Sequence, residues 1–300
     1  MTTTSIPFIK MVGTGNDFLI VDTRRGRTPN RRSSWPDLAR AMCDRHYGVG
    51  ADGLLVVEPS RKATAIMRIF NADGSEAEMC GNGARCVAAY LAGSPPWSAA
   101  RAAKPRRVSL QTQAGVLNAE VAGSIVKIRM SVPKDLSLGR SVAVNGRPLT
   151  LGFVNTGVPH AVVAVPDLDA VDVPGLGRQL RHHEAFGPRG TNVDFIQTVP
   201  SSPNRLQIRT YERGVEGETL ACGTGVTAAA VVHAASHSAR SRQDGNGRAR
   251  QRIEVQTRSG ETLLVHVSLE GHTVSEVILE GPVRWVCRGA FPWKSRGRGR

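Results

Sequence analysis

Two cysteines of this chain begin the same short phrase, and its residue types suit acid/base chemistry. The phrases read Glu76-Ala-Glu-Met-Cys80-Gly-Asn-Gly and Glu218-Thr-Leu-Ala-Cys222-Gly-Thr-Gly, and an alanine-rich stretch follows each. Glycines let the backbone approach a ligand closely, and the first N–H groups of a helix have no partner within that helix. Those N–H groups and the helix dipole favour a thiolate or a bound carboxylate. The repeated phrase therefore predicts two acid/base thiols that act on one small carboxylate substrate.

The remaining cysteine chemistry is less promising. The chain has five cysteines, Cys43, Cys80, Cys86, Cys222 and Cys287, and no two of them form a Cys-x-x-Cys pair. An odd count in a long chain argues against a secreted disulfide framework, and the spacing does not suit zinc. We expect free thiols and no metal site. Two inert buried cysteines are the alternative for the repeated phrase, but such residues need no flanking glycines.

The segments that must position these thiols are mostly strands. Many alternate apolar and polar residues, which is typical of half-exposed antiparallel sheet. Helices are expected after the two cysteines, at 82–91 and 224–235, and two more at 34–44, with Ser34 as N-cap, and at 176–184. The predicted strands are 6–11, 18–22, 54–58, 65–71, 107–111, 116–121, 125–130, 153–155, 161–165, 193–197, 205–211, 253–256, 263–267 and 274–279.

Each half of the chain thus holds several strands and one helix that is entered through Cys-Gly-x-Gly. We predict an α+β fold of two pseudo-symmetric lobes, each a mostly antiparallel sheet wrapped around a central helix, with the active site in the cleft between them. The first lobe is expected at 1–124 and the second at 125–276. Residues 277–292 are expected to return to the first lobe, and 131–148, rich in Gly and Pro, to form the crossing loop.

The net charge of +14 is concentrated in a few places. Four arginine-rich stretches, 24–32, 96–107, 237–252 and the tail 293–300, carry the whole excess. They lack apolar periodicity, so we expect solvated loops and a flexible basic tail rather than a dedicated nucleic-acid site. The chain also lacks a membrane-length apolar run and a signal peptide, which predicts a cytoplasmic protein without membrane contact.

A set of motifs in family order identifies the chain as similar to the diaminopimelate epimerases. The motifs are Lys10-Met-Val-Gly-Thr-Gly-Asn-Asp-Phe18, Gly48-Val-Gly-Ala-Asp52, Phe70-Asn-Ala-Asp-Gly-Ser-Glu76, Met79-Cys-Gly-Asn-Gly-Ala-Arg-Cys86, Pro159-His160, Thr191-Asn192, and Tyr211-Glu-Arg213 with Ala221-Cys-Gly-Thr-Gly225. They span nearly the whole length. Each motif is weak alone, but the set is specific.

The resemblance implies an epimerase that interconverts LL- and meso-2,6-diaminopimelate in lysine and peptidoglycan precursor biosynthesis. It implies no cofactor, no pyridoxal phosphate and a homodimer. One cysteine thiolate removes the α-proton and the other thiol delivers a proton to the opposite face. By the family pattern these roles fall to Cys80 and Cys222. His160 assists the proton transfers, and Glu212 is a further catalytic residue near the α-amino group and the acid/base machinery.

The resemblance also implies substrate-binding residues. The amides of Asn16, Asn71 and Asn192 resemble those that hold the distal end of the substrate, and Arg213 follows Glu212 as a carboxylate-binding residue. We assign the anion hole to the helix starts at Gly81, Asn82, Gly223 and Thr224. Each of these residues also has a simpler structural explanation. The three asparagines could cap a helix or stabilise a turn, Glu212 and Arg213 could form an ordinary surface ion pair, and His160 could be a buried structural residue. The chain departs from the family in having Gly53 where some members have Gln, and Val158 where many have Asn.

Two rival functions remain. Proline or hydroxyproline racemases share the two-cysteine fold, but Asn82 and the Tyr211-Glu-Arg213 phrase favour diaminopimelate. A basic nucleic-acid or partner-binding protein would use the arginine-rich stretches, and its binding would be sensitive to salt.

Overall fold

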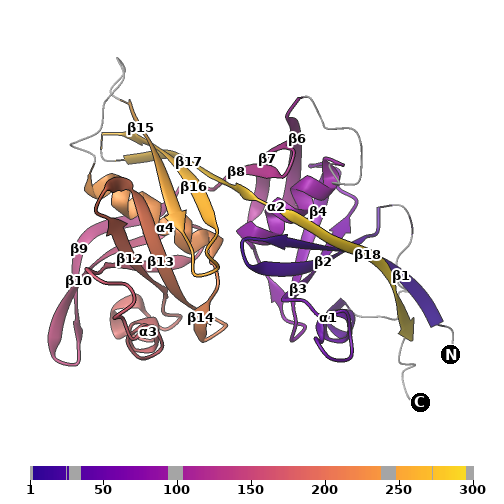
Figure 1. The fold of residues 1–300 in the computed structure, drawn as a ribbon, viewed down its shortest axis with the longest axis horizontal. Coiled ribbons are helices and arrows are strands. Elements are labelled where there is room, and N and C mark those ends of the chain that lie inside the picture. Colours follow the sequence, from indigo (N-terminus) through magenta and orange to yellow (C-terminus); the bar gives the residue numbers. More distant parts are fainter. Residues whose placement is uncertain are drawn as a thin grey trace. The chain divides into compact units, whose positions relative to one another are not determined.

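The computed structural model describes residues 3–24, 26, 35–93, 104–237, 248–271 and 273–294. The chain forms two compact units, Met1–Ile128 with Pro282–Arg300, and Arg129–Gly281 (Figure 1). It crosses between them at 128–129 and 281–282, where the sequence analysis expected 124–125 and 276–277. Among the described residues, no helix combines the length and the apolar character that crossing a bilayer requires.

The first unit is a mixed sheet with one helix on each face. Its strands pair in the order β18-β1-β2-β3-β4-β6-β7, with β2–β3 and β4–β6 parallel and the other pairs antiparallel. Its elements are β1 (Thr3–Gly13), β2 (Asn16–Asp22), α1 (Trp35–Cys43), β3 (Gly53–Glu58), β4 (Ala65–Asn71), β5 (Glu76–Ala77), α2 (Gly81–Leu91), β6 (Arg106–Thr112), β7 (Gly115–Ala122), β8 (Ile125–Arg129) and β18 (Arg284–Lys294).

The second unit repeats this topology. Its strands pair in the order β9-β10-β11-β12-β13-β15-β16, with β11–β12 and β13–β15 parallel and the other pairs antiparallel. Its elements are β9 (Lys134–Val144), β10 (Arg147–Asn155), β11 (Pro159–Ala164), α3 (Val173–Arg181), η1 (Glu184–Phe186), β12 (Asn192–Val199), β13 (Ser202–Glu212), β14 (Gly217–Thr219), α4 (Gly223–Ser236), β15 (Arg248–Gln256), β16 (Thr262–Glu270) and β17 (Thr273–Pro282).

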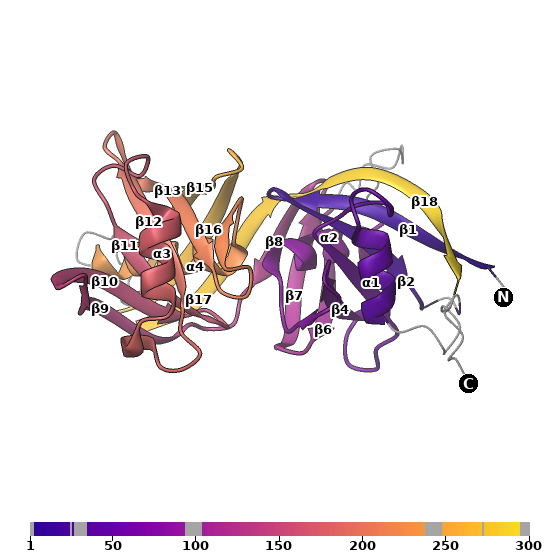
Figure 2. The same cartoon turned by 90° about the horizontal axis from the view of Figure 1, so that it is seen from below.

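The helix after each cysteine lies inside its unit. All residues from Val226 to Ala235 in α4 are buried, as are Gly81 to Ala89 in α2. A helix that is apolar on every side must be covered on every side, and the curved sheet does this. The other helices, α1 and α3, lie outside the sheets (Figure 2); α3 packs on Val193 and Phe195 of β12, whereas Asp194 between them faces α4. The predicted α+β fold of two similar units is confirmed.

One predicted loop is wrong. Residues 131–148 were expected to form a Gly- and Pro-rich crossing, but β9 and β10 make a hairpin there, with Val144 opposite Arg147. The two turn residues, Asn145 and Gly146, have φ of 50° and 73°. Positive φ at both positions matches the right-handed twist of the flanking strands, and Asn-Gly is the preferred pair for it. The turn signal was present in the sequence.

Several boundaries also differ. Helix α3 begins three residues before the predicted 176, because Asp172 caps it by accepting the Gly175 N–H at 3.0 Å. Parts of the arginine-rich stretches are strand, namely the starts of β6 and β15 and the end of β18. Ser34, the predicted N-cap, lies outside the described residues, as do residues 25, 27–32, 96–103, 238–247 and 295–300 of the predicted basic loops and tail.

Candidate active site

Cys80 is the N-cap residue of α2. Its backbone is extended (φ −144°, ψ 116°), and its Sγ accepts the N–H of Gly83 at 3.4 Å. A side chain at Gly83 would crowd Leu55, since a Cβ there would lie 3.1 Å from a Leu55 methyl carbon. The glycine therefore lets the helix start pack directly on β3.

Cys222 holds the same position at the start of α4. Its backbone is also extended (φ −118°, ψ 113°), and its Sγ accepts the N–H of Gly225 at 3.4 Å. A Cβ on Gly225 would lie 2.4 Å from an oxygen of Asp194. This position must be glycine as long as the carboxylate lies beneath it. Gly81, Asn82, Gly223 and Thr224 occupy the first positions of the two helices, where N–H groups have no partner within the helix.

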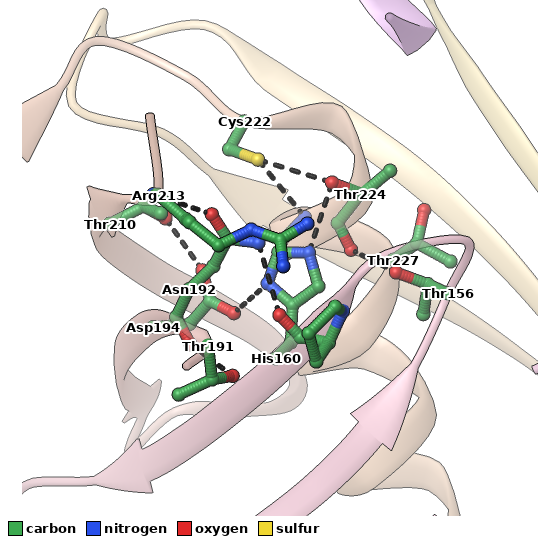
Figure 3. Close-up of polar contacts among 12 residues, drawn as sticks. Thr156, His160, Thr191, Asn192, Asp194, Thr210, Arg213, Cys222, Thr224 and Thr227 are labelled. Carbon is green, nitrogen blue, oxygen red and sulfur yellow. Dashed lines mark hydrogen bonds and ion pairs between the residues drawn. The ribbon is translucent and has the colours of Figure 1, made fainter. Parts of the chain in front are cut away.

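The second unit holds a buried polar chain beneath Cys222 (Figure 3). His160 of β11 is fully buried, and its Nδ1 lies 2.7 Å from Oδ2 of Asp194 on β12, which is also fully buried. Thr210 of β13 donates its hydroxyl to Oδ1 of the same carboxylate at 2.8 Å. On the other side, His160 Nε2 lies 3.0 Å from the Thr224 hydroxyl, which is 3.3 Å from Cys222 Sγ. The chain thus runs unbroken from carboxylate to thiol.

The environment of Cys222 disfavours its thiolate in the free protein. Burial raises the pKa of its thiol well above the usual value, and the charges of Glu212 and Asp194 raise it further. Hydrogen bonds from the Thr224 hydroxyl and the Gly225 N–H act in the opposite direction. Burial also raises the pKa of Glu212, at the end of β13. In the resting site these effects favour the neutral thiol of Cys222.

Asn192 and Arg213 join two strand ends in the same unit. The Asn192 amide donates to the Pro159 carbonyl at 3.0 Å and accepts the Arg213 backbone N–H at 2.8 Å. This arrangement fixes Asn192 at the carboxyl side of β13, beside His160 and Glu212. The second Nδ2 proton of Asn192 can still meet a ligand.

The first unit holds a second polar chain beside Cys80. Arg85 of α2 is fully buried and donates to Asn82 Oδ1 at 2.8 Å and to the Thr14 hydroxyl at 2.6 Å. Asn82 Nδ2 donates to Asn16 Oδ1 at 2.7 Å, and Asn16 Nδ2 donates to Asp52 at 3.0 Å. Arginine only donates and a carboxylate only accepts, so these two ends fix the orientation of both amides.

Asn71 stands apart from that chain. It ends β4, is exposed, and donates its amide to the Ser75 hydroxyl at 2.9 Å. Gly53, the position that departs from the family pattern, pairs with Asn71 in the sheet, and a Cβ there would lie 2.9 Å from the Phe70 carbonyl. Val158, the other departure, lies in the turn before β11, where its carbonyl accepts the Thr156 N–H at 3.1 Å.

Four residues of the site were not predicted from the sequence: Asp194, Thr210, Asp52 and Arg85. Asp194 follows Asn192 by two positions in a strand, so both point to the same face, and this was the signal for it. Thr210 lies opposite Asp194 in the β12–β13 pair. Asp52 and Arg85 were within the recognised motifs but had no role assigned. All five cysteines are free thiols, and no cluster of metal-binding side chains occurs in the described part of the chain.

The sequence of this chain matches a known protein family and its curated members. A sequence model of the diaminopimelate epimerase family matches residues 8–133 and 152–286. The curated diaminopimelate epimerase of Aquifex aeolicus (strain VF5) is 40% identical over 290 residues, which cover 94% of this chain and 96% of that protein.

Two solved structures share the fold at 17% identity. One is a PhzF-family phenazine biosynthesis protein from Bacillus anthracis (TM-score 0.68, covering 97% of this chain and 99% of that one). The other is a hydroxyproline epimerase from Agrobacterium vitis with bound trans-4-hydroxy-L-proline (TM-score 0.66, covering 96% and 93%). At this identity the structures support the fold, whereas the family model and the curated relative support membership. The chain belongs to the diaminopimelate epimerase family.

Proposed function

We propose that this protein interconverts LL- and meso-2,6-diaminopimelate without pyridoxal phosphate or any other cofactor, in lysine and peptidoglycan precursor biosynthesis. The observation that carries the proposal is the equivalence of Cys80 and Cys222. Each is an N-cap whose sulfur accepts the N–H three residues later at 3.4 Å, and each lies in the family's own motif. A stereocentre is inverted by one base and one acid, and the chain provides two matched thiols.

In the proposed mechanism one cysteine thiolate removes the α-proton and the other thiol protonates the opposite face of the carbon. A single base would mostly return the proton to the face it came from. The α-hydrogen of an amino acid is a very weak acid, so the charge that develops on the α-carbon and carboxylate needs stabilisation. The helix starts at 81–82 and 223–224 supply N–H donors, and each such donor in a water-excluded site contributes about 3 kcal/mol to the transition state.

The remaining side chains are assigned to binding. Asn16, Asn71 and Asn192 are proposed to hold the distal end of the substrate, with Arg213 on a carboxylate and Glu212 at the α-amino group. The fixed orientation of the Asn16 amide supports this, because one of its Nδ2 protons is donated to Asp52 and the other remains for a substrate oxygen. His160 is proposed to assist the proton transfers from its place beside Thr224. A homodimer in the cytoplasm is part of the same proposal and is tested by sedimentation and fractionation.

A direct assay tests the function. The purified protein is incubated with LL-diaminopimelate, and the stereoisomers are separated by chiral chromatography. We expect the meso isomer to accumulate to equilibrium, and L-proline and trans-4-hydroxy-L-proline to remain unchanged. Racemised proline together with untouched LL-diaminopimelate would instead support the rival racemase.

A further inference from the structure

The buried chain of the second unit contains a carboxylate that neither the family motifs nor the proposed binding residues require. Asp194 lies at its end, 2.7 Å from His160, and Thr224 connects His160 to Cys222. In Figure 3 these side chains follow one another from β12 to the start of α4. Asp194 is fully buried, both of its oxygens accept hydrogen bonds, and the fold leaves out a side chain at residue 225 to make room for it.

We propose that Asp194 is a positioning residue that enables His160 to exchange a proton with Cys222 through the hydroxyl of Thr224. The proposal rests on the proposed function, because it assigns the resting place of the proton that Cys222 must lose before it can act as a base. The hydrogen bonds of His160 go to Asp194 and Thr224, and none goes to the sulfur directly. Thr224 therefore acts as the relay, and Asp194 acts through His160.

The donor and acceptor roles follow from the end of the chain. The ionised Asp194 carboxylate can only accept, and Thr210 already donates to its Oδ1, so Nδ1 of His160 carries a proton directed at Oδ2. The neutral imidazole then has Nε2 as an acceptor. It takes the Thr224 hydroxyl proton, and the Thr224 oxygen takes the Cys222 S–H. Every hydrogen bond of the chain points from the thiol to the carboxylate.

The proton step moves two protons and no electrons. The S–H bond of Cys222 breaks and its proton forms a new O–H bond on Thr224, while the original hydroxyl proton of Thr224 moves to Nε2 of His160. The products are a Cys222 thiolate, an unchanged threonine and an imidazolium beside Asp194. The two hydrogen bonds of the Thr224 hydroxyl are re-formed in the reverse direction, and His160 keeps its Nδ1–H bond to Asp194. Both states are therefore fully hydrogen-bonded, and the buried imidazolium has an adjacent counter-charge.

The relay role of Asp194 can be distinguished from a purely electrostatic effect of its charge on Cys222. The groups that face Cys222 and His160 are Asp194 from β12, Glu212 at the end of β13, Arg213 directly after it, and Thr224 from α4 (Figure 3). As simple charges, Asp194 and Glu212 both oppose the thiolate, so removal of either would lower the pKa of Cys222. In the relay, loss of Asp194 removes the counter-charge of the imidazolium, so His160 no longer accepts the proton of Cys222 and the thiolate forms less readily. The two roles predict opposite signs.

The test is the alkylation rate of Cys222 by iodoacetamide at neutral pH, measured by mass spectrometry of the peptide that contains it. We expect Asp194→Asn and Thr224→Val to slow alkylation about tenfold, which corresponds to one pKa unit. The matched control, Glu212→Gln, removes a carboxylate outside the relay and should speed it. Thr224→Ser restores the hydroxyl and should return the wild-type rate.

Acceleration by Asp194→Asn, as for Glu212→Gln, would overturn the proposal, as would a wild-type rate in Thr224→Val. Circular dichroism checks the fold of each variant. If Asp194→Asn does not fold, the comparison of Thr224→Val with Thr224→Ser decides the question. The ¹⁵N NMR signals of His160 in the wild-type protein provide a second test, and we expect them to show the proton on Nδ1. A resting proton on Nε2 alone would contradict the relay. None of these readouts uses diaminopimelate, so a failure of the proposed function would leave them unaffected.

Discussion

Cys80 and Cys222 are structurally equivalent: each caps the helix that follows it, and each sulfur accepts the N–H three residues ahead at 3.4 Å. Their surroundings differ. Beside Cys80 the polar chain runs through two amides to Asp52, whereas beneath Cys222 it runs through an imidazole to Asp194. An amide chain fixes orientation, but an imidazole can also store a proton. The duplicated fold thus carries one chain suited to positioning and one suited to proton transfer.

Removal of either thiol should abolish epimerisation. Cys80→Ala and Cys222→Ala each delete one of the two proton-transfer groups, and the other cannot serve both faces of the carbon. We expect turnover to fall at least about a thousandfold, since acid–base catalysis contributes 10²–10⁴ in rate and inversion needs both groups. The measurement is the chiral assay, with Cys287→Ala, an exposed thiol of β18, as the control. Near-normal turnover in either variant would refute the two-base assignment.

Arg85 should matter for substrate affinity as well as for stability. Its guanidinium fixes the Asn82 amide and the Thr14 hydroxyl from a fully buried position. Arg85→Met removes the donor that fixes both amides, and a buried acceptor without a donor costs about 1–3 kcal/mol. We expect a lower urea midpoint and a higher KM. Arg68, a partly exposed arginine paired with Glu76, offers a control; an equal effect of Arg68→Met on KM would contradict the assignment.

His233, near the carboxyl end of α4, should make the second unit sensitive to mild acid. Burial lowers its pKa to about 4, with the neighbouring His237 contributing. Its pKa in the unfolded chain is about 6.5, so the stability it contributes is complete above that pH and is lost as the pH falls towards 4. We expect the free energy of unfolding to drop between pH 7 and pH 5, and His233→Gln to reduce this drop. His46→Gln, at an exposed position, should leave it unchanged; an identical drop in His233→Gln would contradict the account.

The β9–β10 hairpin provides a test of the fold. Gly146 has a φ of 73°, where a Cβ is strained, so Gly146→Ala should lower the free energy of unfolding by about 1 kcal/mol. Gly217 of β14 has nothing near its missing Cβ and no positive φ, and Gly217→Ala serves as the control. Equal thermal midpoints for wild type and Gly146→Ala would show that the turn is not held in this conformation.

The sequence predicted those features that depend on local rules. The Cys-Gly-x-Gly phrases and the alanine runs after them led to α2 and α4 within one residue, because a cap and a helix former act over a few positions. The fold class followed from strand alternation and from the repeat. In contrast, the hairpin at 131–148 was missed because its strand β9 is largely exposed and lacks an apolar pattern, so only Asn145-Gly146 marked it.

The polar chains were harder to predict because their members come from separate strands. His160 and Asp194 are 34 positions apart, and Asn16 and Asn82 are 66 apart. Only the pairing of β11 with β12, and the packing of α2 beside β1 and β2, brings them together. Glu212 and Arg213 were found as a motif, but the desolvation that raises the pKa of Glu212 depends on the surrounding fold, which the sequence pattern does not reveal.

Deuterium incorporation during turnover tests the central claim most directly. LL-diaminopimelate is incubated in D₂O with protein stripped of metals and pyridoxal phosphate, and both isomers are analysed by mass spectrometry at low conversion. Two thiols acting on opposite faces predict one deuterium at the inverted α-carbon of the meso product and almost none in the remaining LL substrate. Equal labelling of both isomers, or a product without deuterium, would contradict the two-base account.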